Sequence, residues 1–271
     1  MIYLVTAGNL PAFLTATSLD AILGARLYTQ YQVYGLDYPA IDFWLQQNES
    51  GAATAALSRF DGWLAVSAGE GADLDELAEF ARMVGGFFRI EALPALCERL
   101  RDCGELTGGA VFRYSGDGFG GAQGDVHPQP DLRQVYQTIC AANTWFSDTT
   151  DWAGWYTHTS HLLRHRLGLC CAVQKDGKVV STGGAYTMGQ DIAVIGGLAT
   201  LPDYRGRGYA TQILHYLVDA VREQGKIPAL FCAKESLSGY YMRNGFVPAG
   251  SWAELQLAAP KAEKEEQGEA K

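Results

Sequence analysis

Two arginines and two glycines alternate in a short segment whose residue types suit anion binding. Arg205, Gly206, Arg207 and Gly208 directly precede an amphipathic pattern that predicts a long helix. Glycine lets the backbone approach a ligand closely. The first N–H groups of a helix lack intrahelical partners, and the helix dipole adds partial positive charge there. The segment therefore favours a phosphate site, with a glycine-rich turn and two solvated arginines as the alternative.

A regular order of predicted elements surrounds this segment. Two amphipathic helices are predicted at 131–142 and 151–166. Three strand-like runs joined by tight turns then predict an antiparallel meander; they span 167–174, 178–189 and 192–201. The meander places the third run directly before the arginine–glycine segment.

The elements after the segment predict a crossover. Apolar residues recur at helical spacing from Ala210 to Val221, and Gly225 is a natural helix end. The apolar run 227–233 predicts a buried strand, which pairs in parallel with 192–201 because a helix joins them. A short helix at 236–245 and a closing strand at 246–257 complete this half.

Two motifs in this half resemble the GNAT superfamily of N-acetyltransferases. Arg205-x-x-Gly208-x-Ala210 matches the R/Q-x-x-G-x-G/A pyrophosphate loop of that superfamily, and YYMRNGF (240–246) is similar to its second signature, a tyrosine four residues before Gly-Phe. The predicted order of helices and strands is also the order in the family. The resemblance covers about residues 131–257.

The resemblance implies a co-substrate and the residues that bind it. Acetyl-CoA is the implied acyl donor, and no metal is expected. The implied pyrophosphate ligands are the main-chain amides of Arg205, Gly206, Arg207, Gly208, Tyr209 and Ala210. The backbone around Leu198, Ala199 and Thr200 would pair with the pantetheine like an added strand. The strands 192–201 and 227–233 would diverge to admit the thioester.

Two residues are candidates for catalysis under the same resemblance. Tyr241 stands where many family members place the acid that protonates the departing thiolate. Its alternatives are a hydrogen bond to the cofactor sulfur or packing alone, and packing is the expected role of Tyr240. Glu235 is a candidate general base, which lies between the predicted strand 227–233 and the predicted helix 236–245. The alternatives are a solvated loop carboxylate at Glu235 and a water chain as the base.

The first half repeats the order of elements of the second without its anion loop. A hairpin is predicted at 42–60, and strand, helix and strand follow at 64–67, 73–84 and 87–92. The segment that corresponds to the arginine–glycine loop is acidic; it contains Glu70, Asp73, Asp75 and Glu76. These carboxylates would cap the helix themselves and repel a pyrophosphate. We predict a degenerate copy that does not bind CoA and walls the acceptor groove, with an unrelated α/β domain as the alternative.

Length and composition agree with two halves. The 271 residues suggest about two domains. The predicted fold class is α/β with a mixed sheet, as a tandem acetyltransferase-like fold. We predict an N-terminal domain at 1–125, a catalytic domain at 126–258 and a disordered charged tail at 259–271. The six cysteines form no CxxC pair and are expected to be free thiols in the cytoplasm.

The charge restricts the partners that we expect. A formal net charge of −9 argues against nucleic acids and anionic membranes, and no apolar run is long enough to span a bilayer. The first 104 residues carry 13 acidic and 6 basic side chains. This bias weakly suggests a cationic acceptor, although acidity also aids solubility.

These observations favour one function and leave two alternatives. The favoured function is acetyl-CoA-dependent N-acetyl transfer, in which an amine of a small molecule or peptide attacks the thioester directly in a ternary complex. The alternatives are a non-catalytic acyl-CoA-binding or regulatory module and a transferase of a longer acyl group. The amine and the oligomeric state are left open.

Three further patterns have weaker functional alternatives. His158, His161 and His165 share one face of a predicted helix. We favour a partly exposed helix face over a metal site or a contact with the acceptor. Cys170 and Cys171 lie in a strand and are expected to be structural thiols. GDGFGG (116–121) matches a dinucleotide motif literally, but no helix pattern follows it, so we expect a loop or linker over 115–130.

Overall fold

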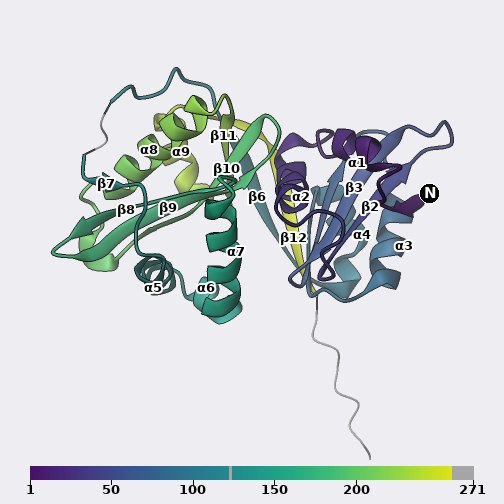
Figure 1. Ribbon diagram of the computed structural model, residues 1–271, viewed down its shortest axis with the longest axis horizontal. Helices are drawn as coiled ribbons and strands as arrows, with labels where there is room; N and C mark the ends of the chain where they lie inside the picture. The colour runs from purple at the N-terminus through teal and green to yellow at the C-terminus, as the bar shows by residue number, and fades with distance from the viewer. Residues whose placement is uncertain (122–123, 258–271) are drawn as a thin grey trace, which may run out of the picture.

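One mixed sheet runs through the whole molecule (Figure 1). The computed structural model describes residues 1–121 and 124–257. Within these residues the sheet has twelve strands, in the order β1-β2-β3-β4-β5-β12-β6-β11-β10-β9-β8-β7. The fold class is therefore the predicted α/β class with a mixed sheet. The predicted tail at 259–271 lies outside the described residues.

The first half supplies six of these strands and the helices between them. Its elements are β1 (Ile2–Leu4), α1 (Leu10–Ala16), α2 (Ala21–Tyr34), β2 (Ile41–Gln47), β3 (Ala53–Phe60), β4 (Trp63–Ala68), α3 (Leu74–Val84), β5 (Arg89–Ala92), α4 (Pro94–Arg99) and β6 (Gly104–Tyr114). The predicted hairpin, strand, helix and strand correspond to β2 through β5. The helices α1 and α2 and the long strand β6 were not predicted.

The second half follows the predicted order closely. Its elements are β7 (Val126–His127), α5 (Leu132–Ala142), α6 (Thr144–Thr149), α7 (Trp152–Arg164), β8 (Leu169–Lys175), β9 (Lys178–Met188), β10 (Ile192–Thr200), α8 (Tyr209–Glu223), β11 (Ile227–Cys232), α9 (Ser238–Arg243) and β12 (Phe246–Leu257). Asp131 caps α5 by accepting a hydrogen bond from the backbone N–H of Gln134.

The same unit of strand, helix and strand occurs once in each half. In the first half β4 is antiparallel to β3 and parallel to β5, with α3 as the crossover. In the second half β10 is antiparallel to β9 and parallel to β11, with α8 as the crossover. The predicted internal repeat is therefore present in the fold.

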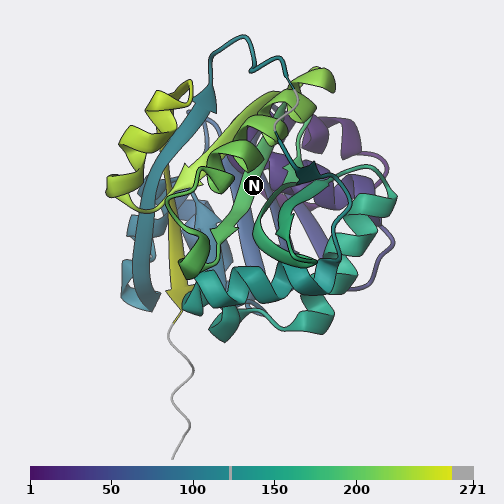
Figure 2. The same ribbon diagram turned by 90° about the vertical axis from the view of Figure 1, so that its left-hand side faces the viewer.

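The two halves exchange their last strands. β6 belongs to the first half but pairs with β11 of the second. β12 belongs to the second half but pairs with β5 of the first. The two exchanged strands also pair with each other along their whole length, antiparallel, from Gly104 opposite Leu257 to Tyr114 opposite Phe246. Each half therefore contains one strand from the other. Figure 2 shows the two exchanged strands side by side, β6 in blue and β12 in yellow.

Glycines make this central pairing possible. A Cβ atom at Gly104 would lie 2.1 Å from the carbonyl oxygen of Gln256 on β12, and one at Gly109 would lie 2.2 Å from the carbonyl oxygen of Cys232 on β11. Neither backbone can move away without breaking a strand pair. These glycines thus allow close strand packing in β6.

Helices cover the two faces of the sheet in different ways. In the second half α8 packs on one face through its buried residues Ile213, Leu217 and Val221. The helix α5 covers the other face, where it contacts β9 and β10. The helix α2 lies between the halves in Figure 1 and contacts β4 of the first half as well as β9 and β10 of the second. One face of the second half is therefore partly walled by the first.

The predicted linker is anchored to α8 where the structure describes it. The backbone N–H groups of Phe119 and Gly120 donate to the carboxylate of Asp219 at 2.8 and 3.2 Å. The Phe119 ring stacks on His215 with ring centroids 3.4 Å apart. The glycine-rich segment 116–121 therefore binds a carboxylate of its own chain. The predicted boundary after residue 125 falls between β6 and β7 and stays a prediction.

All six cysteines lie in the described part of the chain, and each is free. Cys171 is fully buried in the core, and burial raises its pKa well above the ordinary thiol value. Burial also raises the pKa of Cys170, to about 11. Both thiols are therefore structural, as predicted. Among the described helices, none combines the length and the apolar character that crossing a membrane requires.

Candidate active site

The loop before α8 leaves its backbone amides open. A short 3-10 turn over Pro202–Tyr204 leads from β10 into Arg205. Gly206 and Gly208 have φ angles of +75° and +80°, which favour glycine. Gly208 is the N-cap of α8, and no side chain of the described residues caps the helix there. A Cβ atom at either glycine would meet nothing within 4 Å, so the loop is accessible.

The two arginines hold the loop in place. Arg205 donates from Nε to the carbonyl oxygen of Thr200 at 3.2 Å. Arg207 donates to the carbonyl oxygen of Asp203 at 3.0 Å and lies over the Tyr204 ring, 5.2 Å from its centroid. Both side chains bond to uncharged carbonyls, so their positive charges add to the field at the start of α8.

The strands β10 and β11 separate beyond their first residues. Their parallel pairing runs from Ile192 opposite Ile227 to Val194 opposite Ala229. Beyond it β10 is irregular, with shifts in its register with β9 and a φ of +62° at Gly197. The separation gives the backbone of Leu198, Ala199 and Thr200 an edge that β11 does not cover. The structure thus supplies a divergence where the resemblance implied one.

Tyr241 lies in the core beside this divergence. It is buried on α9, and its ring is close to those of Phe112, Tyr240 and Phe246. Burial, followed by the nearby Cys232, raises its pKa to about 12. Its neighbour Tyr240 shares a hydrogen bond of 3.2 Å with Thr211 on α8. A phenol with so high a pKa stays protonated at neutral pH.

Glu235 and the three histidines occupy different surroundings. Glu235 is exposed in a single 3-10 turn just after β11. His158 lies on α7, and its Nδ1 shares a hydrogen bond of 2.8 Å with the hydroxyl of Tyr34 on α2. Burial, and then the charge of Arg26, lower the pKa of His158 to about 4. The histidine face therefore contacts the first half.

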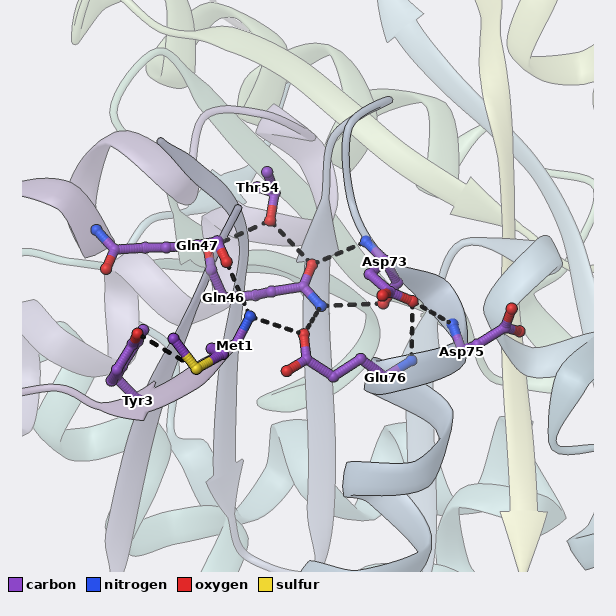
Figure 3. A network of polar contacts seen from close by, with 8 residues as sticks. All are labelled: Met1, Tyr3, Gln46, Gln47, Thr54, Asp73, Asp75 and Glu76. Carbon is purple, nitrogen blue, oxygen red and sulfur yellow. Dashed lines mark hydrogen bonds and ion pairs between the residues drawn. The ribbon is translucent and has the colours of Figure 1, made fainter. Parts of the chain in front are cut away.

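The first half fills the corresponding position with its own side chains (Figure 3). Asp73 caps α3 by accepting from the backbone N–H groups of Asp75 and Glu76 at 3.1 and 3.0 Å. The side chain of Gln46 bonds the backbone of Asp73 and the carboxylate of Glu76. The N-terminal ammonium of Met1 lies 3.1 Å from Glu76. Two of the first amides of α3 are thus already bonded to Asp73, which caps its helix as predicted, whereas Asp75 and Glu76 contribute backbone donors.

Comparison with known proteins agrees with this difference between the halves. Residues 132–246 match the model of the acetyltransferase (GNAT) family. The second half therefore contains a GNAT domain, a class that transfers acyl groups from acyl-CoA. The family model does not cover the first half. No curated protein matches the chain in sequence.

Solved structures with the same architecture span nearly the whole chain. A tandem GNAT protein from the clavulanic acid biosynthesis pathway is 13% identical, covers 96% of this chain and 99% of its own, and has a TM-score of 0.56. A GCN5-related N-acetyltransferase from Sphaerobacter thermophilus is 16% identical, with 94% of each chain covered and a TM-score of 0.57. A protein from Drosophila is 9% identical, covers 94% and 98%, and reaches 0.64. At these identities the likeness shows the fold alone, and that fold is tandem.

Proposed function

We propose that this chain is an acetyl-CoA-dependent N-acetyltransferase whose second half binds the donor. The observation that carries the proposal is the contrast between two equivalent helix starts. Asp73 occupies the start of α3 in the first half. The start of α8 has glycines at positive φ, open space and two arginines instead. A pyrophosphate fits the second site and is repelled by the first.

The residues around the divergence would hold the donor along its length. The amides from Arg205 to Ala210 would bind the pyrophosphate. The uncovered edge at Leu198, Ala199 and Thr200 would hydrogen bond the pantetheine amides. Acetyl-CoA would supply an activated thioester carbonyl between β10 and β11. A backbone amide of β10 would stabilise the negative charge that develops on the carbonyl oxygen.

The proposed site has groups that can give and take each proton moved in the acetyl transfer. A neutral amine nitrogen forms a bond to the thioester carbonyl carbon, and the carbon–sulfur bond breaks. Tyr241 would give its phenolic proton to the departing sulfur, and the nitrogen would lose a proton to a base. Glu235 is our candidate for that base, directly or through water. The Tyr241 phenolate is then restored by a proton from solvent.

The acceptor and location are further parts of the proposal. We propose a small-molecule or peptide amine as acceptor and the cytoplasm as location, where thiols such as the six free cysteines stay reduced. A module that binds acyl-CoA without turnover is the second candidate, because the loop contacts the CoA end alone. Transfer of a longer acyl group is favoured by no particular contact.

Thermal shift and thiol release together test the proposal. Acetyl-CoA should raise the melting temperature of the purified chain. Free thiol should then appear when an amine from a varied panel is added. Stabilisation without thiol release for any amine would support the non-catalytic module. No stabilisation by acetyl-, succinyl- or longer acyl-CoA would refute both candidates.

A further inference from the structure

We propose that the Phe231 and Trp252 rings form the platform for the acceptor, and that the acceptor is an amine carried on an aromatic or bulky apolar group. The inference rests on the proposed transfer function. It concerns the face of the sheet opposite α8, where α2 of the first half packs. The two rings come from β11 and from the exchanged strand β12.

Phe231 lies at the divergence, on the α2 side of the sheet. It is partly exposed and packs against the buried cluster that contains Ala25 of α2, Val194 and Ala229. The parallel pairing of β10 and β11 ends two residues earlier, at Ala229. Phe231 therefore borders the gap in which the thioester would lie, across from Gly196.

Open space lies on the other side of this gap. Val194 packs toward α2 and Ile195 toward α8, so strand alternation turns Gly196 to the α2 side. Gly196 is partly exposed, and a Cβ atom there would meet nothing within 4 Å. Its φ is not in the left-handed region. Space for an acceptor, rather than backbone conformation, is thus the feature that this glycine provides.

Trp252 extends the platform away from the gap. Its ring centroid lies 5.2 Å from that of Phe231, at an interplanar angle of 53°. It stands opposite Gly109 on β6, which has no side chain to cover it. The indole Nε1 is buried and has no hydrogen-bond partner among the described residues.

The charged groups beside the platform cancel one another. Arg26 of α2 makes two hydrogen bonds to Glu91, at 2.9 and 3.0 Å. Arg89 lies 3.7 Å from Glu254, which is two residues from Trp252 on the same side of β12. Two arginines face two glutamates, so this cluster has no surplus negative charge to attract a polycation. Aromatic surface is the remaining means of recognition.

The acidic start of α3 lies away from this platform. The residues Asp73, Asp75 and Glu76 surround the start of α3, and α3 packs on the face of the sheet opposite α2. Their charges therefore do not line the acceptor side. The carboxylates at the start of α3 therefore give no support to a cationic acceptor at the platform.

Steady-state kinetics with two primary amines tests the proposal. The probes are 2-phenylethylamine and spermidine, with acetyl-CoA as donor. We expect kcat/KM to be at least about tenfold higher for 2-phenylethylamine. Trp252→Ala should raise KM for 2-phenylethylamine on the order of tenfold and leave KM for acetyl-CoA unchanged. Phe80→Ala is the matched control, because Phe80 packs on Trp44 with ring centroids 5.3 Å apart on the far face. It should leave both KM values unchanged.

The outcomes separate this inference from the proposed function. Equal or better turnover of spermidine, or an unchanged KM in Trp252→Ala, would overturn the platform while transfer itself stands. If no amine releases thiol, calorimetry with 2-phenylethylamine and the CoA-bound chain becomes the test. Binding to the wild type that Trp252→Ala loses would support the platform without catalysis. Absence of binding to the wild type would overturn it.

Discussion

A single residue of the α8 loop allows the charge of the proposed anion site to be changed with little change in shape. Gly208 is exposed and has a φ of +80°, and a Cβ atom added to it would meet nothing within 4 Å. Asn and Asp are the side chains that best tolerate such a φ. Gly208→Asn and Gly208→Asp therefore differ in one formal charge and in little else. Both carry about 1–2 kcal/mol of backbone strain.

The charge sets the size of the expected difference. We take a separation of roughly 5 Å between a carboxylate at residue 208 and a bound pyrophosphate, which is close enough for direct repulsion. Two unit charges at that distance repel by about 1 kcal/mol in water and about 3 kcal/mol at an effective dielectric of 20. Acetyl-CoA should thus bind between roughly fivefold and two-hundredfold more weakly to Gly208→Asp than to Gly208→Asn. Gly208→Asn should bind more weakly than the wild type through bulk and strain.

Isothermal calorimetry at two salt concentrations measures this difference. Added salt should reduce the difference in acetyl-CoA affinity between the two variants, because the site is exposed to solvent. Melting temperatures should be alike for both variants and a few degrees below that of the wild type. Equal acetyl-CoA affinities of Gly208→Asn and Gly208→Asp would refute the electrostatic argument. Wild-type affinity in both variants would show that the pyrophosphate binds elsewhere.

Three further predictions concern residues outside the loop. Tyr241→Phe should lower kcat on the order of a hundredfold with an unchanged Kd for acetyl-CoA. Because the pKa of Tyr241 is raised to about 12, the phenol of the wild type should stay protonated up to high pH. An unchanged kcat in Tyr241→Phe would show that Tyr241 is not the general acid. The pKa of His158 is lowered to about 4, so acidification from about pH 6.5 should favour the unfolded chain by up to about 3 kcal/mol. In urea unfolding, His158→Gln should lose less free energy of unfolding between pH 7 and pH 4.5 than the wild type. An equal loss in both proteins would show that other groups cause the pH dependence. Asp219→Ala removes the acceptor for the backbone amides of Phe119 and Gly120. It should lower the free energy of unfolding in urea by about 1–3 kcal/mol without changing the acetyl-CoA affinity. An unchanged unfolding midpoint would show that the segment 116–121 is held by its other contacts.

Local patterns carried most of what the sequence could predict. The loop from Arg205 to Gly208, the helix after it and the strands on both sides were recognisable because their residues are adjacent in the chain. The acidic start of α3 was equally readable, since Asp73 caps the helix that it precedes. Periodicity and capping are short-range properties, so one sequence suffices for them.

The unpredicted elements depend on distant partners. The strand β6 contains Gly104, Gly108 and Gly109 and shows no clear strand pattern, and the close approach of β11 and β12 that requires these glycines is not visible locally. The helix α2 contacts both halves, so its apolar residues do not fall on one clear face. Phe231 and Trp252 meet across an exchanged strand. Their proximity follows from topology, which periodicity does not reveal.

The exchanged strands also constrain the order in which the chain can complete its fold during synthesis. The edge of β5 is covered by β12, whose last residue is Leu257. The first half therefore leaves the ribosome with an unpaired strand edge that persists until β12 has been translated. Such an edge is a template for pairing with other chains. Expression of residues 1–125 alone should accordingly give an aggregation-prone fragment rather than an isolated domain.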